Sequence, residues 1–194
     1  MSDWDESQHP RDEAGRFGEG GGEGGGEGGG VSVGGGGSNK EAVQAGVNAI
    51  PKEHLAEAGI SSISSQSTVE NQNGKQVAGL ARRSGSGGTD ILVADKVNGK
   101  AVRDPTGTTV HEIGHAIDNK SGNRLSREHA ETIRADANKM SAADKHLAQH
   151  YLQNDRELFA ECYKLKYSPS KKGAFGMGQK AAEKKFAKSL AVMI

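Results

Sequence analysis

The stretch TTVHEIGHAID, residues 108–118, places two histidines four apart with a glutamate directly after the first. Side chains four residues apart lie on the same face of an α-helix, about one turn from each other. His111 and His115 can therefore offer two imidazole nitrogens to one metal ion, and Glu112 can reach a water on that ion without being a ligand. The stretch predicts a helix that carries two zinc ligands and a general base.

A catalytic zinc ion needs a third protein ligand and an open position for water. The downstream stretch RELFAECY places Glu157 and Glu161 on one face of a second predicted helix. We interpret Glu157 as the third ligand and Glu161 as the carboxylate that accepts the other ring N–H of a zinc histidine, here His111. Asp118 continues the zinc face of the first helix and is a candidate acceptor for a second such N–H. Three further histidines remain alternative third ligands, although each lies in a polar stretch where a surface histidine is usual: His129, His146 and His150.

Gly114 lies inside the first predicted helix, for which Thr108 or Thr109 is the expected N-cap. A glycine inside a helix costs roughly 1 kcal/mol relative to alanine, so its presence indicates a close approach by a strand or by substrate. An apolar stripe on the opposite face is expected to be buried, and it consists of Val110, Ile113 and Ile117.

The two motifs together, HEIGHAID and ELFAECY, resemble those of the gluzincin metallopeptidases. Within that family they are most similar to the peptidase domain of anthrax lethal factor and its relatives, which pair an HExGHAxD motif with an ExFAEx helix. The resemblance covers residues 90–167 and implies a zincin-like fold, a Zn²⁺ cofactor and peptide hydrolysis of the thermolysin type. It also implies Glu157 as the third ligand. The family uses a tyrosine just before the glutamate helix to stabilise the oxyanion, and Tyr151 is the matching residue here.

Short alternating or β-branched runs fill residues 60–103 and predict three or four strands. Asn-Gly pairs at residues 73–74 and 98–99 favour hairpin turns, so we expect these strands to be mostly antiparallel. Helical patterns precede and follow this region. The expected fold is α+β and zincin-like, with a small, mostly antiparallel sheet followed by the active-site helix and a helical C-terminal part. An edge strand within Thr89 to Asp95 is expected to align an extended peptide by strand addition.

Residues 1–38 are predicted to be a disordered acidic arm with a glycine-rich linker, and residues 39–194 the folded domain. The stretch SQHPRDEAGRFG in this arm resembles the short HPRDExGxF stretches often found in tailed-phage head-morphogenesis and other prophage-encoded proteins. The resemblance makes a phage or prophage origin plausible. It also makes virion proteins candidate partners, and the host bacterial cytoplasm or the virion the expected location.

Cys162 is the single cysteine, which excludes an intrachain disulfide and a cysteine-based zinc site. No stretch is apolar or long enough for a signal peptide or a membrane span, so we expect no membrane partner. The sequence therefore predicts a zinc-dependent endopeptidase that acts on a peptide or protein substrate.

Two other classes of function remain open. The first is a phage structural or interaction protein that keeps the zincin fold, in which the metal serves only stability. The second is a basic nucleic-acid-binding module built on the lysines between residues 164 and 188. Few aromatic residues accompany those lysines, so we expect no nucleic-acid partner.

Overall fold

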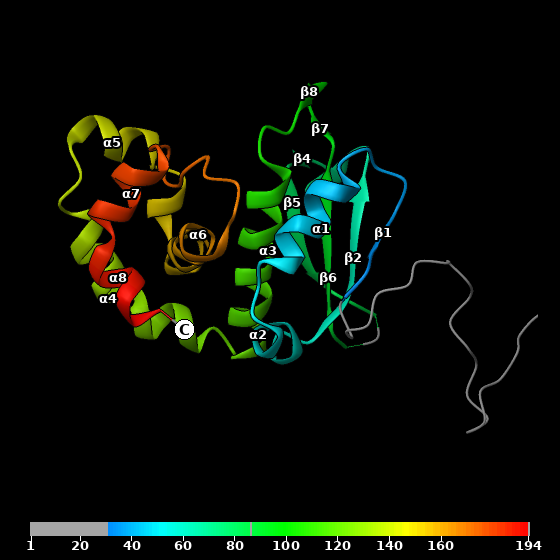
Figure 1. The fold of residues 1–194 in the computed structure, drawn as a ribbon, viewed down its shortest axis with the longest axis horizontal. Coiled ribbons are helices and arrows are strands. Elements are labelled where there is room, and N and C mark those ends of the chain that lie inside the picture. The colour runs from blue at the N-terminus through cyan, green and yellow to red at the C-terminus, as the bar shows by residue number, and fades with distance from the viewer. Residues whose placement is uncertain (1–30, 86, 194) are drawn as a thin grey trace, which may run out of the picture.

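The computed structural model describes residues 31–85 and 87–193, which mix α-helices with small β-sheets (Figure 1). The strands precede most of the helices along the chain, which agrees with the predicted α and β content. In the described part of the chain, none of the helices is long and apolar enough to cross a membrane. The elements in chain order are β1 (Val33–Gly34), α1 (Lys40–Asn48), α2 (Lys52–Glu57), β2 (Ile60–Gln66), β3 (Val69–Glu70), β4 (Gln76–Val77), β5 (Gly79–Arg83), β6 (Thr89–Ala94), β7 (Lys96–Val97), β8 (Lys100–Ala101), α3 (Pro105–Lys120), α4 (Arg124–Ala137), α5 (Ala142–Leu147), the 3₁₀-helix η2 (Tyr151–Gln153), α6 (Asp155–Tyr167), α7 (Gln179–Lys185) and α8 (Ala187–Val192).

The main sheet has four strands in the order β1-β2-β6-β5. β1 pairs with β2 and β2 pairs with β6 in parallel, whereas β5 and β6 are antiparallel. The prediction of a mostly antiparallel sheet is therefore wrong for the main sheet. The two Asn-Gly pairs do connect antiparallel hairpins, β3 with β4 and β7 with β8, but these hairpins lie outside it. A turn motif specifies only local pairing and carries no information on the parallel pairing of strands far apart in the chain.

β6 lies inside the main sheet, so the expectation of an edge strand within Thr89 to Asp95 is wrong. The stretch TDILVA is largely apolar, and five of its six residues are buried. A strand that is covered on both faces has such a continuous apolar run, whereas a half-exposed strand alternates. The edges of the sheet are β1 and β5, and β5 is the edge strand that contacts α3.

Residues 31–38 fall within the predicted arm and linker, but part of this segment belongs to the sheet. Val33 pairs with Ile63 of β2 and is buried. Farther along, the Gly37 N–H donates to the Ser65 carbonyl at 2.9 Å. The folded domain therefore includes residues before the boundary predicted between 38 and 39, while the prediction for residues 1–30 lies outside the described residues.

α3 lies between the sheet and the later helices, and it contacts α1, β5, β6 and α6 (Figure 1). It begins at Pro105, and the side chain of the preceding Asp104 accepts a hydrogen bond from the Gly107 N–H at 3.0 Å. The N-cap is therefore Asp104 and not Thr108 or Thr109, because an aspartate directly before a proline satisfies two preferences of a helix start at once. The predicted apolar stripe is buried, and it consists of Val110, Ile113 and Ile117.

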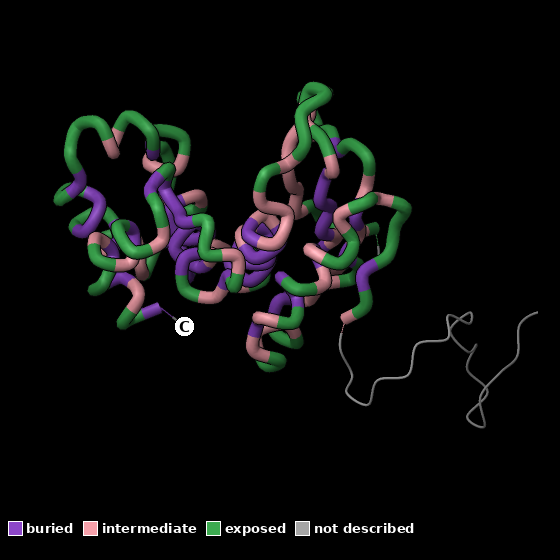
Figure 2. The backbone as a smooth tube through the Cα atoms, turned by 45° about the horizontal axis from the view of Figure 1, so that its top comes forward, coloured by how far each residue is buried: buried purple, intermediate pink, exposed green. Residues whose placement is uncertain are grey.

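The helices from α4 to α8 form the helical half of the molecule, in which α4, α7 and α8 pack against α6. Figure 2 shows buried backbone concentrated where this half meets the sheet half. The rings of Phe175 and Phe186 stack with centroids 4.1 Å apart, and both residues are fully buried. The segment that follows α6 is therefore anchored in the core of the helical half.

Candidate metal centre

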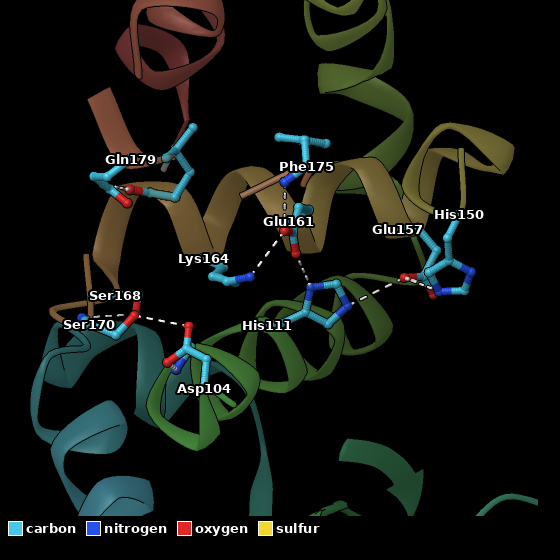
Figure 3. A network of polar contacts seen from close by, with 12 residues as sticks. Asp104, His111, His150, Glu157, Glu161, Lys164, Ser168, Ser170, Phe175 and Gln179 are labelled. Carbon is cyan, nitrogen blue, oxygen red and sulfur yellow. Dashed lines mark hydrogen bonds and ion pairs between the residues drawn. The ribbon is translucent and has the colours of Figure 1, made fainter. Parts of the chain in front are cut away.

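α3 and α6 lie close together and bring the two sequence motifs to one place (Figure 3). A Cβ atom at Gly114 of α3 would lie 3.1 Å from the Cα of Ala160 and 3.1 Å from the Cβ of Tyr163. This spacing is tighter than side chains normally make, so a glycine at this position lets the helices approach. The close approach at Gly114 comes from α6, and not from a strand or substrate as the sequence indicated.

His111, His115 and Glu157 form a cluster whose candidate ligand atoms lie within 4.8 Å of one another. The Nε2 atoms of the two histidines are 3.1 Å apart. The carboxylate oxygens of Glu157 lie 3.3 Å from the Nε2 of His111 and 3.4 Å from that of His115. The N-cap of α6 fixes the position of Glu157, because the Asn154 side chain accepts a hydrogen bond from the Glu157 N–H at 2.9 Å.

These separations suit a single metal ion. Ligand atoms of a tetrahedral zinc site lie about 3.3 Å apart, given zinc–nitrogen distances of about 2.0–2.1 Å. Two imidazoles and a carboxylate are a donor set that zinc accepts, and other divalent transition ions accept it too. Two ring nitrogens that face each other at 3.1 Å repel through their lone pairs unless a proton or a metal ion lies between them. The cluster therefore fits a cation at this position.

Glu161 holds His111 from behind the cluster (Figure 3). Its carboxylate accepts a hydrogen bond from the His111 Nδ1 at 3.0 Å, which leaves the Nε2 of that ring facing the cluster. The same carboxylate accepts from the Lys164 Nζ at 3.1 Å and from the Phe175 N–H at 2.9 Å. Glu161 is 1% exposed, so these three bonds fix both the carboxylate and the histidine ring in front of it.

The charges around His111 favour a cation in the cluster. Burial disfavours the charged ring, but hydrogen bonds to Glu157 and Glu161 outweigh burial and raise the pKa of His111 to about 10. Burial also disfavours the charged form of Glu157, which on its own would raise the pKa of this carboxyl. The hydrogen bonds to His111 and His115 outweigh burial and hold the pKa of Glu157 well below its usual range. Without a metal, the cluster therefore keeps a proton at neutral pH, and a metal ion that binds here displaces this proton.

Glu112 lies on the wall of an open cleft of about 1160 Å³ that also contains the cluster. A Cβ atom at Gly79 of β5 would come within 2.7 Å of the Glu112 Oε1 and 2.6 Å of the Thr108 Cγ2. A glycine at this position therefore allows β5 to pass so close to α3. As a result, an edge strand of the main sheet runs directly past the predicted general base.

Tyr151 lines the cleft from η2, just before α6. Its ring centroid lies 6.2 Å from that of His111 and 5.9 Å from that of Phe175. Burial raises the pKa of the Tyr151 hydroxyl far above its ordinary value, and the charges of Glu161 and Glu157 raise it further. The hydroxyl therefore stays protonated and is a hydrogen-bond donor beside the cluster.

Asp118 is fully buried on α3, and its contacts lead to α4 and α6. One carboxylate oxygen accepts a hydrogen bond from the Ser126 N–H at 2.9 Å, and the other lies 3.9 Å from the Arg156 Nε. The His115 Nδ1, whose proton Asp118 was a candidate to accept, has no hydrogen-bond partner among residues 31–85 and 87–193. The structure therefore joins Asp118 to α4 and not to a histidine of the cluster.

The three alternative histidines lie in different surroundings. His129 stacks on Phe159 with ring centroids 5.9 Å apart, and His146 is exposed on α5. The His150 Nε2 lies 3.9 Å from a Glu157 oxygen, but its side chain is 72% exposed at the edge of the cluster (Figure 3). Glu157 is therefore the residue that completes the compact group.

Sequence reasoning did not find three residues that shape this site, namely Gly79, Lys164 and Phe175. Lys164 lies three residues after Glu161, so helical spacing could have indicated the contact. Phe175 contributes its backbone N–H, and Gly79 contributes the lack of a side chain. No signal in the local sequence could have assigned these two to the site.

No protein-family model matches this chain, and a search of curated proteins finds no significant match. The functional assignment therefore depends on the two motifs and on the geometry of the cluster.

Proposed function

We propose that this protein is a zinc-dependent endopeptidase of the gluzincin type, with a zincin-like domain in which α3 is the active-site helix. The observation that carries the proposal is the convergence of His111, His115 and Glu157 in one open cleft with Glu112. Catalytic zinc sites have three protein ligands and an open position, whereas structural zinc sites are closed by four protein ligands. The open cleft therefore favours catalysis over a metal that serves only stability.

The cluster and the residues around it have separate roles in peptide hydrolysis. The three ligands would hold the zinc ion, which when bound would act as a Lewis acid toward the peptide carbonyl and would lower the pKa of water. Glu112 takes the proton of the attacking water and then passes it to the leaving amine. Glu161 keeps the ring of His111 in one orientation. Tyr151, with its hydroxyl protonated, donates a hydrogen bond to the oxygen on which negative charge develops.

The substrate aligns along β5 in this proposal. β5 pairs with β6 on one side only, so its other edge is available to add an extended peptide as a further strand. Gly79 lets this strand pass close to Glu112, and residues 78–81 line the cleft. A peptide that pairs with β5 therefore has its backbone next to the general base. In this proposal β5 has the substrate-aligning role that the sequence analysis predicted for the strand within Thr89 to Asp95.

The biological setting is also a proposal. The resemblance of the N-terminal stretch SQHPRDEAGRFG supports a phage or prophage origin, although this stretch lies outside the described residues. Peptide or protein substrates are then expected in the host bacterial cytoplasm or in the virion, with virion proteins as candidates.

Metal analysis of the purified full chain tests whether the three proposed ligands bind zinc. We expect about one zinc ion per chain, and less than about a tenth of that in His115→Ala, because two protein ligands do not hold zinc tightly. A matched His146→Ala variant changes an exposed histidine of α5 and is expected to keep the metal. Equal zinc content in the wild type and in His115→Ala would refute the assigned ligand set.

A further inference from the structure

One wall of the cleft is formed by β-strands and the turns next to them, and we call it the strand wall. It carries basic side chains that form no ion pair within the described residues. Lys75, Lys100 and Arg103 line this wall, and we call them the basic lip. None of the three forms an ion pair within the part of the chain that the structure describes. The two hairpins that carry the lysines are joined, because the Asn98 N–H donates to the Gln76 Oε1 at 2.8 Å. Cations from separate segments therefore gather on one wall.

The register of the strands places the basic lip along β5. Gly79 pairs with Val93, near the end of β6, and the hairpin of β7 and β8 follows directly. The lip therefore lies at the Gly79 end of β5, where this strand passes Glu112. The other end of β5 carries Arg82 and Arg83, which are exposed and extend to opposite faces of the strand. The Nε of Arg82 lies 4.0 Å from a carboxylate oxygen of Asp90 on β6. Among the described residues, Arg83 is therefore the cation at this end of β5 that forms no ion pair with a carboxylate.

The acidic side chains that line the cleft belong to α3, to its N-cap Asp104 and to α6. Asp104 caps α3 and accepts a hydrogen bond from the Ser170 hydroxyl at 3.0 Å. Glu157 and Glu161 face the histidines of the cluster. Within the described part of the chain, the basic lip forms no ion pair with the acids that share the cleft, which are Asp104, Glu112, Glu157 and Glu161.

We infer that the strand wall selects extended peptide segments that carry aspartate or glutamate on either side of the bond that is cut, an inference that rests on the proposed peptidase function. A peptide paired with β5 extends its side chains alternately to the two faces of the sheet, where they meet the basic lip at one end and the arginines at the other. Acidic side chains form ion pairs there, whereas basic side chains are repelled.

A nucleic acid is the other polyanion that a basic wall attracts, but this cleft suits it less well. A nucleic acid has no backbone amides to pair with the edge of β5. Binding of single strands also relies on aromatic stacking, and among the described residues that line the cleft the aromatic rings are Tyr151 and the histidines. An acidic peptide matches both the charge and the strand edge.

The test uses three quenched-fluorescence peptides that differ only at residues flanking the cut bond, which are all glutamate, all glutamine or all lysine. With the full chain, kcat/KM is expected to fall in that order, by about two- to fivefold for each charge, and the differences are expected to shrink at 1 M salt. The triple variant K75E/K100E/R103E is expected to reverse the order. A control with the same change in charge, K180E/K184E/K188E on α7 and α8, is expected to keep it.

A binding measurement separates failure of this inference from failure of the peptidase proposal. Fluorescence anisotropy records the affinity of the same peptides, and of a labelled oligonucleotide, for the full-length Glu112→Gln variant. If the peptides are cut without any preference for charge, the selection of acidic segments is wrong and the peptidase stands. If nothing is cut but the glutamate peptide binds through the basic lip, the peptidase is wrong and the selection stands. Tighter binding of the oligonucleotide than of the glutamate peptide, lost in the triple variant, would overturn the inference in favour of a nucleic-acid site.

Discussion

The two walls of the cleft hold their side chains in different ways. On the helical wall, Glu161 is 1% exposed and makes three hydrogen bonds, and the side chains of His111 and His115 are each 12% exposed. On the strand wall, Lys100 and Arg103 are exposed. A buried side chain with several bonds has one orientation, whereas an exposed cation samples many and contributes a weak ion pair. The helical wall therefore suits chemistry, which needs fixed atoms, and the strand wall suits selection, which needs only charge.

The largest expected effect comes from removing the proton acceptor of the helical wall. Glu112→Gln keeps the size of the side chain but cannot take a proton from water, so kcat/KM is expected to fall by about 10³-fold. The metal content is expected to stay unchanged, because Glu112 is not a ligand. Steady-state kinetics and metal analysis on the same preparation check both statements.

Glu128→Gln is the matched control, because Glu128 pairs with Arg124 on the exposed face of α4. This control is expected to cleave at the wild-type rate. Undiminished cleavage by Glu112→Gln would show that the helical wall does not supply the general base through Glu112.

A smaller effect, on the affinity for zinc, is expected from weakening the hydrogen bond between Glu161 and the ligand His111. Glu161→Gln loses the negative charge that accepts the His111 Nδ1–H, so the affinity for zinc is expected to fall by about 10–100-fold. Competition with a chelator of known affinity measures the change. Glu183→Gln, on α7, serves as the control. Unchanged affinity in Glu161→Gln would mean that the buried bonds of this wall are structural only.

The smallest expected effect concerns the spacing of α3 and α6. Gly114→Ala places a Cβ atom 3.1 Å from the backbone of Ala160, so the free energy of unfolding is expected to fall by about 1–3 kcal/mol. Helix propensity alone predicts the opposite sign, a gain of roughly 1 kcal/mol. Urea unfolding therefore distinguishes the two by sign, and a stabilised variant would contradict the tight packing of the helical wall.

The helical wall could be predicted from the sequence because its parts are local. His111 and His115, like Glu157 and Glu161, lie four residues apart, and helical geometry alone places each pair on one face. Residue type then indicates the chemistry, since imidazole and carboxylate groups are metal ligands. What the spacing could not supply is the reason for Gly114, because its neighbour Ala160 belongs to another helix.

The strand wall could not be predicted, because its arrangement depends on contacts between distant segments. The parallel pairing of β2 with β6 has no turn motif, and it moves β6 from the edge to the interior of the sheet. Gly79 looks like an ordinary strand glycine until α3 packs against it. Phe175 donates through its backbone, so its side chain gives no sign of the bond to Glu161.

The bond between Phe175 and Glu161 also has a consequence for the order in which the protein is made. Chains leave the ribosome from the N-terminus, so α3 emerges first and α6 later. The carboxylate of Glu161 gains its full set of partners only after residue 175 has followed. A growing chain therefore carries all of its proposed zinc ligands before it can hold them rigidly, and full activity is expected only once this later segment has docked.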